Sequence, residues 1–307
     1  MTSALTSANQ QFLNALDRTR SALSQAQLQV SSGLKVAQAS DAPDQVSPIL
    51  QLHVNIAQNQ QTQTNLNQVK GEVDTAEQSV SSVASLLDQV QTLAVQGLST
   101  SQTADTRGTL AAQVQSILEQ VVSISSTSVN GRYIFSWDSD QSPSYQVDAT
   151  AATGVARLSN SPSTRQVQDT QGLSFSVGLS ANAIFDRRDA SDQVTTGNVF
   201  AAIHSVQAAL ASNDTKALQD ASASARDASS YVNQQLAFYG GVQNRVAAAL
   251  DQTTAADTAY RSQLSDRQDA DVTAAILEMQ QLTVNIQAAM SSKAQMPQGS
   301  LFDELSR

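Results

Sequence analysis

Residues 69–94 read VKGEVDTAEQSVSSVASLLDQVQTLA, and small or branched apolar residues recur in them at alternating intervals of four and three. The members of this stripe are Val69, Val73, Ala76, Val80, Val83, Leu87, Val90 and Ala94. This spacing places them along one side of a helix, which is typical of helices that pack lengthwise against other helices. We therefore expect a long helix whose apolar stripe lies in the core of a helical rod.

The helix that carries this stripe has recognisable start and stop signals. Ser47 precedes Pro48, and a serine N-cap followed by proline is a typical helix start. Gly97 and the polar residues 99–101 are typical of its end. A second stripe follows at Leu110, Val114, Ile117, Val121 and Ile124. Because the connection is short, the two helices are predicted to form an antiparallel hairpin.

The middle of the chain has a different pattern. Leu173, Phe175, Val177 and Leu179 alternate with small polar residues or glycine, as expected of a half-buried strand. Residues 133–137, 145–147 and 165–167 are weaker strand candidates. We expect a small β-rich insertion.

Helical spacing returns at Val199, Ile203, Val206 and Leu210, and again at Val232, Leu236, Tyr239, Val246 and Leu250. An isolated helix cannot bury its apolar face, so the helices before the insertion are expected to pack against those after it. The predicted fold is mainly α: a long discontinuous helical coiled-coil rod built from N- and C-terminal segments, with a small β-rich domain inserted in the middle. We place the rod at 43–132 and 197–262 and the insertion at 133–196, as a knob at the tip of the rod.

The two ends of the chain carry narrow apolar seams with heptad spacing. The first comprises Leu5, Phe12, Leu16, Leu23, Ala26 and Val30, and the second Val272, Ile276, Met279, Ile286 and Met290. Two apolar positions in seven indicate coiled-coil docking. Polar residues at Asn9, Thr19 and Thr283 interrupt these seams, so one copy would bury too little surface to offset its ordering entropy. We expect 1–42 and 263–307 to be terminal assembly helices, although packing within one chain is the simpler interpretation of any such stripe.

Composition excludes several classes of protein. Twenty-seven acidic and 17 basic residues give a formal net charge of −10, which disfavours nucleic acid and anionic membrane surfaces as partners. No apolar run approaches the roughly 20 residues that span a bilayer, and Met1 to Gln11 do not resemble a signal peptide. The chain has no cysteine, so it has neither disulfides nor thiolate chemistry.

No catalytic constellation or cofactor motif is found. The chain has two histidines, His53 and His204, and they lack metal-ligand spacing. Asp266, Asp269 and Asp271 cluster before the last seam, where carboxylates are more typical of a helix start than of a metal site. We expect no enzymatic activity, no metal and no cofactor.

Three segments resemble the bacterial flagellin/FlgL family. Residues 31–35, SSGLK, with 40–43, SDAP, resemble the segment that follows the first helix in this family. Residues 129–136, VNGRYIFS, look like the family's NGRY-[LI]-F stretch, although Trp137 stands where glycine is common. The C-terminal Leu264-Ser265, Asp269-Ala270-Asp271 and SLFDEL at 300–305 are similar to the family's ending, with Glu304 in place of the usual aromatic.

The resemblance implies a structural subunit of the flagellum that joins hook to filament as a hook-associated junction protein. It implies export from the cytoplasm through the flagellar type III apparatus without a cleaved signal peptide, and an extracellular location in the flagellum. The implied partners are copies of the chain, an adjacent hook-associated protein, flagellin and, before secretion, an export chaperone. The ending adds Leu301, Phe302 and Leu305 to the expected assembly interface.

Two alternative functions stay open. The chain could instead be a flagellin that polymerises into the filament itself. A membrane-active helical protein, such as a type III translocator, would need broad apolar faces or a spanning segment, and the narrow stripes and acidic charge disfavour it.

Overall fold

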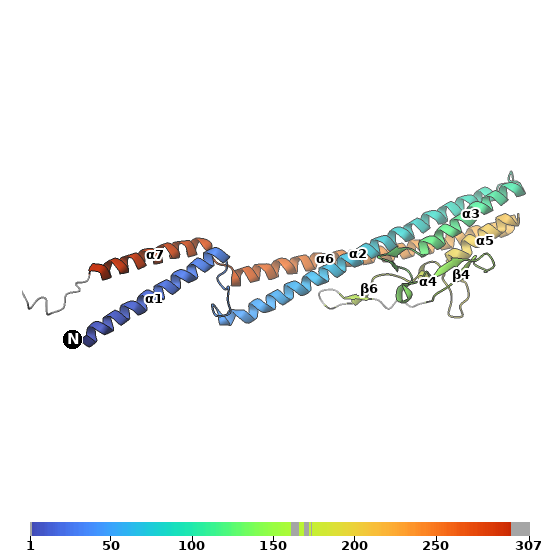
Figure 1. Ribbon diagram of the computed structural model, residues 1–307. Coiled ribbons are helices and arrows are strands. Elements are labelled where there is room, and N and C mark those ends of the chain that lie inside the picture. Colours follow the sequence, from blue (N-terminus) through green and yellow to red (C-terminus); the bar gives the residue numbers. More distant parts are fainter. Residues whose placement is uncertain (1, 161–165, 169–171, 173, 296–307) are drawn as a thin grey trace, which may run out of the picture. The chain divides into compact units, whose positions relative to one another are not determined.

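The computed structural model describes residues 2–160, 166–168, 172 and 174–295. The chain divides into two compact units, a terminal unit of residues 1–59 and 256–307, and a second unit of residues 60–255. The helices α2 (Pro43–Gly97) and α6 (Thr215–Gln268) contribute residues to both. Figure 1 shows the course of the chain, with α1 (Thr2–Ser32) and α7 (Val272–Gln295) belonging to the terminal unit.

Four helices build the frame of the 60–255 unit. Besides α2 and α6 these are α3 (Ala104–Ser125) and α5 (Val199–Ala211), and α3 packs closely on α5. Gln243 of α6 donates a 3.0 Å hydrogen bond to Asp74 of α2. Helices that precede the β region therefore pack against helices that follow it, which confirms the predicted order.

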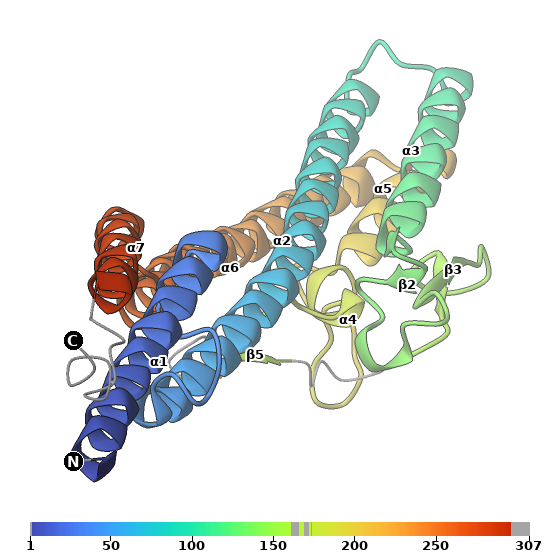
Figure 2. The same cartoon turned by 60° about the vertical axis from the view of Figure 1, so that its left-hand side comes forward.

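The apolar stripe of residues 69–94 lies in the core as predicted. Its eight side chains are between 0% and 6% exposed and belong to one cluster with the buried residues of α3, α5 and α6. Figures 1 and 2 show α2 and α3 running antiparallel on either side of their short connection. The closest helix to α3 is nevertheless α5, so the predicted hairpin is one part of a larger helical packing.

The predicted start of α2 at Pro48 is wrong, because the helix begins five residues earlier at Pro43. Proline is well accommodated in the first turn of a helix, where the amide hydrogen that it lacks has no intrahelical acceptor. Pro43 uses that position here. Pro48 then lies inside the helix, where the only backbone bond it removes is the one to the Asp44 carbonyl one turn earlier.

Arg107 fastens the turns at one end of the 60–255 unit. Its side chain is buried, and its Nε donates to the Gly97 carbonyl at 2.8 Å, where α2 ends. One terminal nitrogen donates to the Ser99 carbonyl at 3.2 Å and the other to Asn213 Oδ1 at 2.5 Å, in the turn between α5 and α6. A single guanidinium thus satisfies helix-end carbonyls of one turn and holds the other turn beside it.

Replacing Arg107 with methionine is expected to lower the free energy of unfolding by about 2 to 3 kcal/mol, because hydrogen bonds from a charged donor are lost and buried carbonyls stay unpaired. Urea unfolding followed by circular dichroism measures this change. Arg226→Met is the control, since Arg226 is exposed on α6 and donates only to Ser222 one turn away. Equal effects of the two substitutions would contradict the fastening role of Arg107.

Among the described residues, three separate two-stranded antiparallel ladders lie between Ser128 and Ser176. They pair β1 (Ser128–Val129) with β2 (Arg132–Tyr133), β3 (Tyr145–Val147) with β4 (Val155–Arg157), and β5 (Gln166–Gln168) with β6 (Ser174–Ser176). The strand predicted at 145–147 is confirmed. The strand predicted at 133–137 ends at Tyr133, because residues 137–139 form the 3₁₀ turn η1 (Trp137–Ser139).

The predicted strand at 173–179 is shorter than expected, although Phe175 and Val177 are buried. Leu173 and Arg165 lie outside the described residues. The insertion is also not a knob at the tip. Its β3 strand packs against α3, and the unit ends in the two helix turns that Arg107 joins (Figure 1).

An aromatic cluster ties the insertion to α5. Phe135, after β2, meets Phe185 edge to face at 5.4 Å between ring centroids, and Phe185 follows the short helix α4 (Ala181–Ile184). Phe200, in the first turn of α5, lies 6.1 Å from Phe185 and 4.8 Å from Tyr145 of β3. Because these rings share one core with the helices, strands this short are stable without a large sheet.

The segment 129–137 contains two unusual backbone conformations. Asn130 and Gly131 have φ of 54° and 77° and link β1 to β2, the geometry that favours asparagine followed by glycine in two-residue hairpins. Trp137 has φ of 45°, which is rare for a bulky residue. Its indole Nε1 donates to the Leu179 carbonyl at 2.6 Å, and its ring occupies the space beside Gly178.

Gly178→Ala is expected to destabilise the protein by about 1 to 3 kcal/mol, because the new Cβ would lie 2.5 Å from Cζ2 of Trp137. In a Trp137→Gly background the same substitution should cost little, giving a coupling free energy of about 1 kcal/mol or more. Urea unfolding of the four proteins by circular dichroism measures this cycle. Gly240→Ala in α6, where nothing lies within 4 Å, is the matched control and should be neutral or stabilising.

Candidate assembly interface

The two helix breaks of the terminal unit lie against each other. Gly33 ends α1 with φ of 71°. The amides of Lys35 and Val36 then donate to the Gln268 carbonyl at 2.7 and 3.2 Å, and the amide of Ala270 donates to the Gly33 carbonyl at 2.9 Å. The break after α1 and the break between α6 and α7 therefore lie side by side. The backbone amides and carbonyls that lose their helical partners there form hydrogen bonds with one another.

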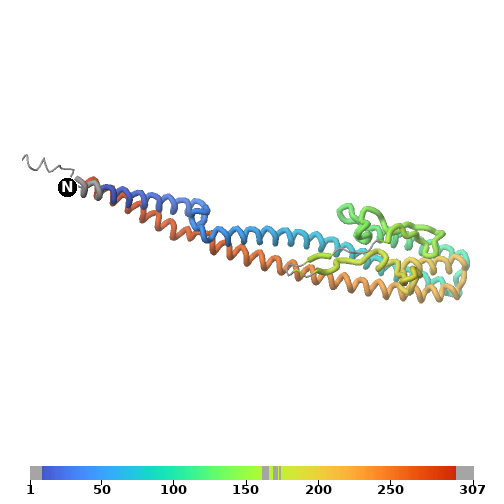
Figure 3. The backbone as a smooth tube through the Cα atoms, turned by 90° about the horizontal axis from the view of Figure 1, so that it is seen from below, coloured from blue at the N-terminus to red at the C-terminus, as the bar shows by residue number. Residues whose placement is uncertain are grey.

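From these breaks α1 and α7 run side by side in opposite directions, as the blue and red ends of the tube in Figure 3 show. Asp271 starts α7 by accepting the amide of Ala274 at 3.0 Å, as predicted for a carboxylate at a helix start. At the far end, Lys293 donates to Asn9 and lies 5.5 Å from the centroid of the Phe12 ring.

The face of α1 that α7 covers coincides with the predicted seam. Ala22 and Gln29 are half-buried beside this seam. Of the seam itself, Leu16 and Ala26 are buried and Phe12, Thr19, Leu23 and Val30 are half-buried. These positions follow one another at intervals of four and three, as expected for two helices that pack lengthwise. Leu5 lies within α1, in the part of that helix whose side chains are not described.

On α7 the covered face is rotated from the predicted seam. Its members are Ala275, Met279, Leu282, Ile286, Ala289 and Lys293, of which Met279 and Ile286 were predicted. Val272, Ile276 and Met290 are 40%, 36% and 49% exposed and stand outside the contact. Alanine at the contact lets the two helices approach closely. A prediction from apolar spacing favours larger side chains over alanine, and it therefore selected the neighbouring face of α7.

The α1–α7 pair leaves other apolar side chains in solvent. Leu13 and Leu28 on α1 and Leu277 and Val284 on α7 are all more than half exposed. Together with Val272, Ile276 and Met290 they form what we call the uncovered set. A helix that is apolar on more than one side is normally buried on those sides. The predicted residues Leu301, Phe302 and Leu305 lie outside the described residues.

The structure also places the histidines and aspartates that the sequence offered as candidate chemical groups. Within the described residues no group of three His, Cys, Asp or Glu side chains is close enough to hold a metal ion, and no helix is long and apolar enough to cross a bilayer. His53 is exposed on α2, and His204 is partly buried on α5. Asp269 accepts from the Ser265 hydroxyl at 2.5 Å, and Asp266 lies within α6.

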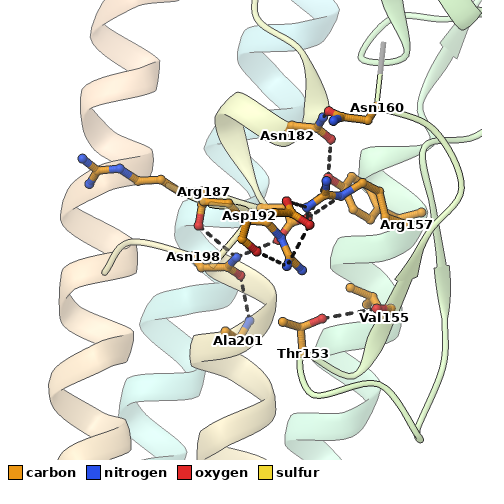
Figure 4. A network of polar contacts seen from close by, with 12 residues as sticks. Thr153, Val155, Arg157, Asn160, Asn182, Arg187, Asp192, Asn198 and Ala201 are labelled. Atoms are coloured by element: carbon orange, nitrogen blue, oxygen red, sulfur yellow. Dashed lines mark hydrogen bonds and ion pairs between the residues drawn. The ribbon is translucent and has the colours of Figure 1, made fainter. Parts of the chain in front are cut away.

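Sequence reasoning missed a polar network in the 60–255 unit that is centred on Asp186. Figure 4 shows the part of this network around Arg157, Asp192 and Asn198. The Asp186 side chain is 1% exposed. One carboxylate oxygen accepts from Asn198 at 2.7 Å and from Arg188 at 2.9 Å, and the other accepts from Arg157 and from the Tyr145 hydroxyl at 3.2 Å. The network joins β3, β4 and the start of α5, and no local pattern marks its members.

Two members of this network, Tyr145 and Arg157, have raised pKa values. Burial raises the pKa of Tyr145 far above its usual range, and the Asp186 carboxylate raises it further, so the phenol stays neutral. Burial opposes the charge of Arg157, but the Asp192 hydrogen bond and Asp186 more than compensate and raise its pKa. Paired in this way, the network has the character of a structural fastening between the strands and α5.

Comparison with known proteins relates the N-terminal part of the chain to bacterial flagellins. Residues 4–139 match the model of the bacterial flagellin N-terminal helical region. This match covers less than half of the chain. The chain is 30% identical to Flagellin B of Helicobacter pylori over 139 residues, which are 45% of this chain and 27% of the relative, so the chain spans about a quarter of that relative's length.

Solved structures of flagellar proteins share the fold of this chain over most of its length. A protein from Vibrio parahaemolyticus described as a flagellar hook-associated protein matches with a TM-score of 0.65 and 18% identity, over 75% of this chain and 100% of that one. FlgL of Xanthomonas campestris matches at 0.57 and 17%, over 68% and 98%. FlgL of Bacillus cereus matches at 0.56 and 18%, over 71% and 100%. The fold is therefore the mainly α fold that was predicted, and it is shared with FlgL.

The family resemblance also has a physical explanation in the structure. The VNGRYIFS segment lies within the matched region, and its Asn-Gly pair forms the tight turn between β1 and β2. Glycine, common in the family at the position of Trp137, suits the positive φ found there. Trp137 adopts the same positive φ that glycine would, and because it carries a bulky side chain its backbone is strained there.

Proposed function

We propose that the chain is a structural subunit of the bacterial flagellum that joins hook to filament as a hook-associated junction protein, and that it is not an enzyme. The observation that carries this proposal is the α1–α7 pair, whose inner face is covered within the chain while the uncovered set stays in solvent. In a subunit that neighbours surround on several sides, such exposed apolar side chains would be buried against the adjacent subunits. The shared fold with FlgL supports the junction position.

In this proposal 1–42 and 263–307 serve assembly, while 43–132 with 197–262 form the rod and 133–196 the inserted domain. The partners are copies of the chain, the adjacent hook-associated protein and flagellin. The chain is exported from the cytoplasm without a cleaved signal peptide, after contact with an export chaperone, and resides outside the cell in the flagellum. The absence of cysteine supports export as an unfolded chain, because no disulfide then hinders threading.

The test replaces Leu277 and Val284 together with lysine. Both face solvent in the single chain, so circular dichroism and monomer stability should stay within about 0.5 kcal/mol of the parent. Incorporation into flagella, measured by quantitative immunoblotting of sheared flagella, should be lost because buried unpaired lysines would lie between subunits. The control replaces Leu158 and Val194 with lysine, since these are apolar residues of the 60–255 unit that are 53% and 43% exposed. Normal incorporation of the first variant would overturn the assembly role of this surface.

A filament-forming flagellin is the second candidate, favoured by the family match over 4–139 and by the identity to Flagellin B. Electron microscopy of the purified chain separates the two functions. Rings or mixed assemblies with neighbouring subunits support the junction protein, whereas long filaments of the chain alone support flagellin. Cells that lack a junction protein should carry hooks without filaments and shed flagellin into the medium.

A further inference from the structure

A cavity of about 420 Å³ lies in the 60–255 unit, in the size range of small-ligand sites. It opens between α2, the β1–β2 hairpin, η1, the segment after β6, and α6. Val73, Ala76, Val177 and Tyr239 line it and are almost fully buried, so they form its floor. The floor is suited to an apolar group of a few carbon atoms.

The rim and walls of this cavity carry excess negative charge. The lining includes three carboxylates, Glu72, Asp138 and Asp140, but only one basic residue, Arg132. Arg132 is ion-paired with Asp140, and Asp138 is exposed at the rim. An anion would be repelled here, and a cation would be attracted.

Aromatic rings add a second preference for a cation. Tyr133 and Trp137 are half-buried walls of the cavity, and aromatic faces attract ammonium and guanidinium groups. The positive φ of Trp137 and the hydrogen bond from its indole to Leu179 hold this ring at the cavity. Strained residues that are held in this way concentrate at binding sites.

We infer that this cavity binds a small organic cation, with the apolar part of the ligand on the floor and its ammonium group at the acidic, aromatic rim. A neutral ligand of the same shape gains the floor contacts but not the attraction of the carboxylates and rings. The cavity lies wholly within the 60–255 unit and is lined by no residue of α1 or α7.

The test uses the intrinsic fluorescence of the full chain, whose one tryptophan is Trp137. The probe is 2-phenylethylammonium, and 2-phenylethanol is its uncharged counterpart. A saturable change in fluorescence is expected, with the charged probe bound about tenfold more tightly. Asp138→Asn should weaken the charged probe several-fold and leave the neutral one unchanged, whereas Asp227→Asn, at an exposed position of α6, should change neither.

Two results would overturn the inference. Equal affinity of the charged and neutral probes would show that the cavity does not select a cation. No saturable change, either in fluorescence or in the nuclear magnetic resonance signal of the Trp137 indole N–H, would show that neither probe enters. Circular dichroism of Asp138→Asn verifies that this rim substitution leaves the fold intact.

Discussion

A chain carrying both Leu16→Lys and Ile286→Lys is expected to be absent from flagella, while its 60–255 unit keeps the fold of the parent. Leu16 is 8% exposed and Ile286 is half-buried on the facing helix. Each replacement removes roughly 2 kcal/mol of apolar burial and puts an ammonium group into the α1–α7 contact. Two unpaired charges in one seam should separate the helices.

Quantitative immunoblotting of sheared flagella measures this loss in cells without the parent chain. The fluorescence of Trp137 reports independently on the 60–255 unit and should remain that of the parent. Leu16→Met with Ile286→Leu preserves side-chain volume and should support incorporation. Lysine-bearing chains that were incorporated at the parent level would show that the α1–α7 contact is not needed for assembly.

Asp186→Ala is expected to lower the free energy of unfolding by about 3 to 5 kcal/mol, because it leaves Arg157 and Arg188 without their buried carboxylate partner. It also removes acceptors of Asn198 and Tyr145, so the strands and the start of α5 lose their common fastening. Urea unfolding followed by Trp137 fluorescence measures the change, and urea, unlike guanidinium chloride, does not screen ion pairs.

Asp192→Ala is the matched control for this substitution. Asp192 contacts the same two arginines, but its side chain is 67% exposed. Exposed ion pairs contribute about 1 kcal/mol or less, and alanine at the φ of 59° found at Asp192 adds about 1 kcal/mol of strain, so the control should cost clearly less than Asp186→Ala. If the two alanine variants had the same stability, burial of the Asp186 carboxylate would not be what makes the network important.

The sequence predicted those parts of the molecule that depend on periodicity. The stripe from Val69 to Ala94 follows from side-chain spacing, which is a local property of a helix, and its burial was foreseen. The pairing of α1 with α7 was also foreseen, from two seams at opposite ends of the chain. On α7, however, spacing did not distinguish the alanine-lined face at Ala275 from the neighbouring face with larger side chains.

Features that depend on distant contacts were not predictable. The role of Asp186 arises because Tyr145, Arg157 and Asn198 converge on it from separate elements. The cation cavity likewise forms where α2, a hairpin and α6 meet. Helix starts were ambiguous for a different reason, since Pro43 and Pro48 are equally acceptable to local rules.

The contact between Asn9 and Lys293 joins residues 284 positions apart in sequence. Nearly the whole polypeptide must therefore exist before α1 meets its partner, and closing so large a loop is slow and entropically costly. Because its covering partner is α7, helix α1 cannot be covered until residues 272–295 have been synthesised. Until then its leucines remain available to whatever binds nascent or unfolded chains.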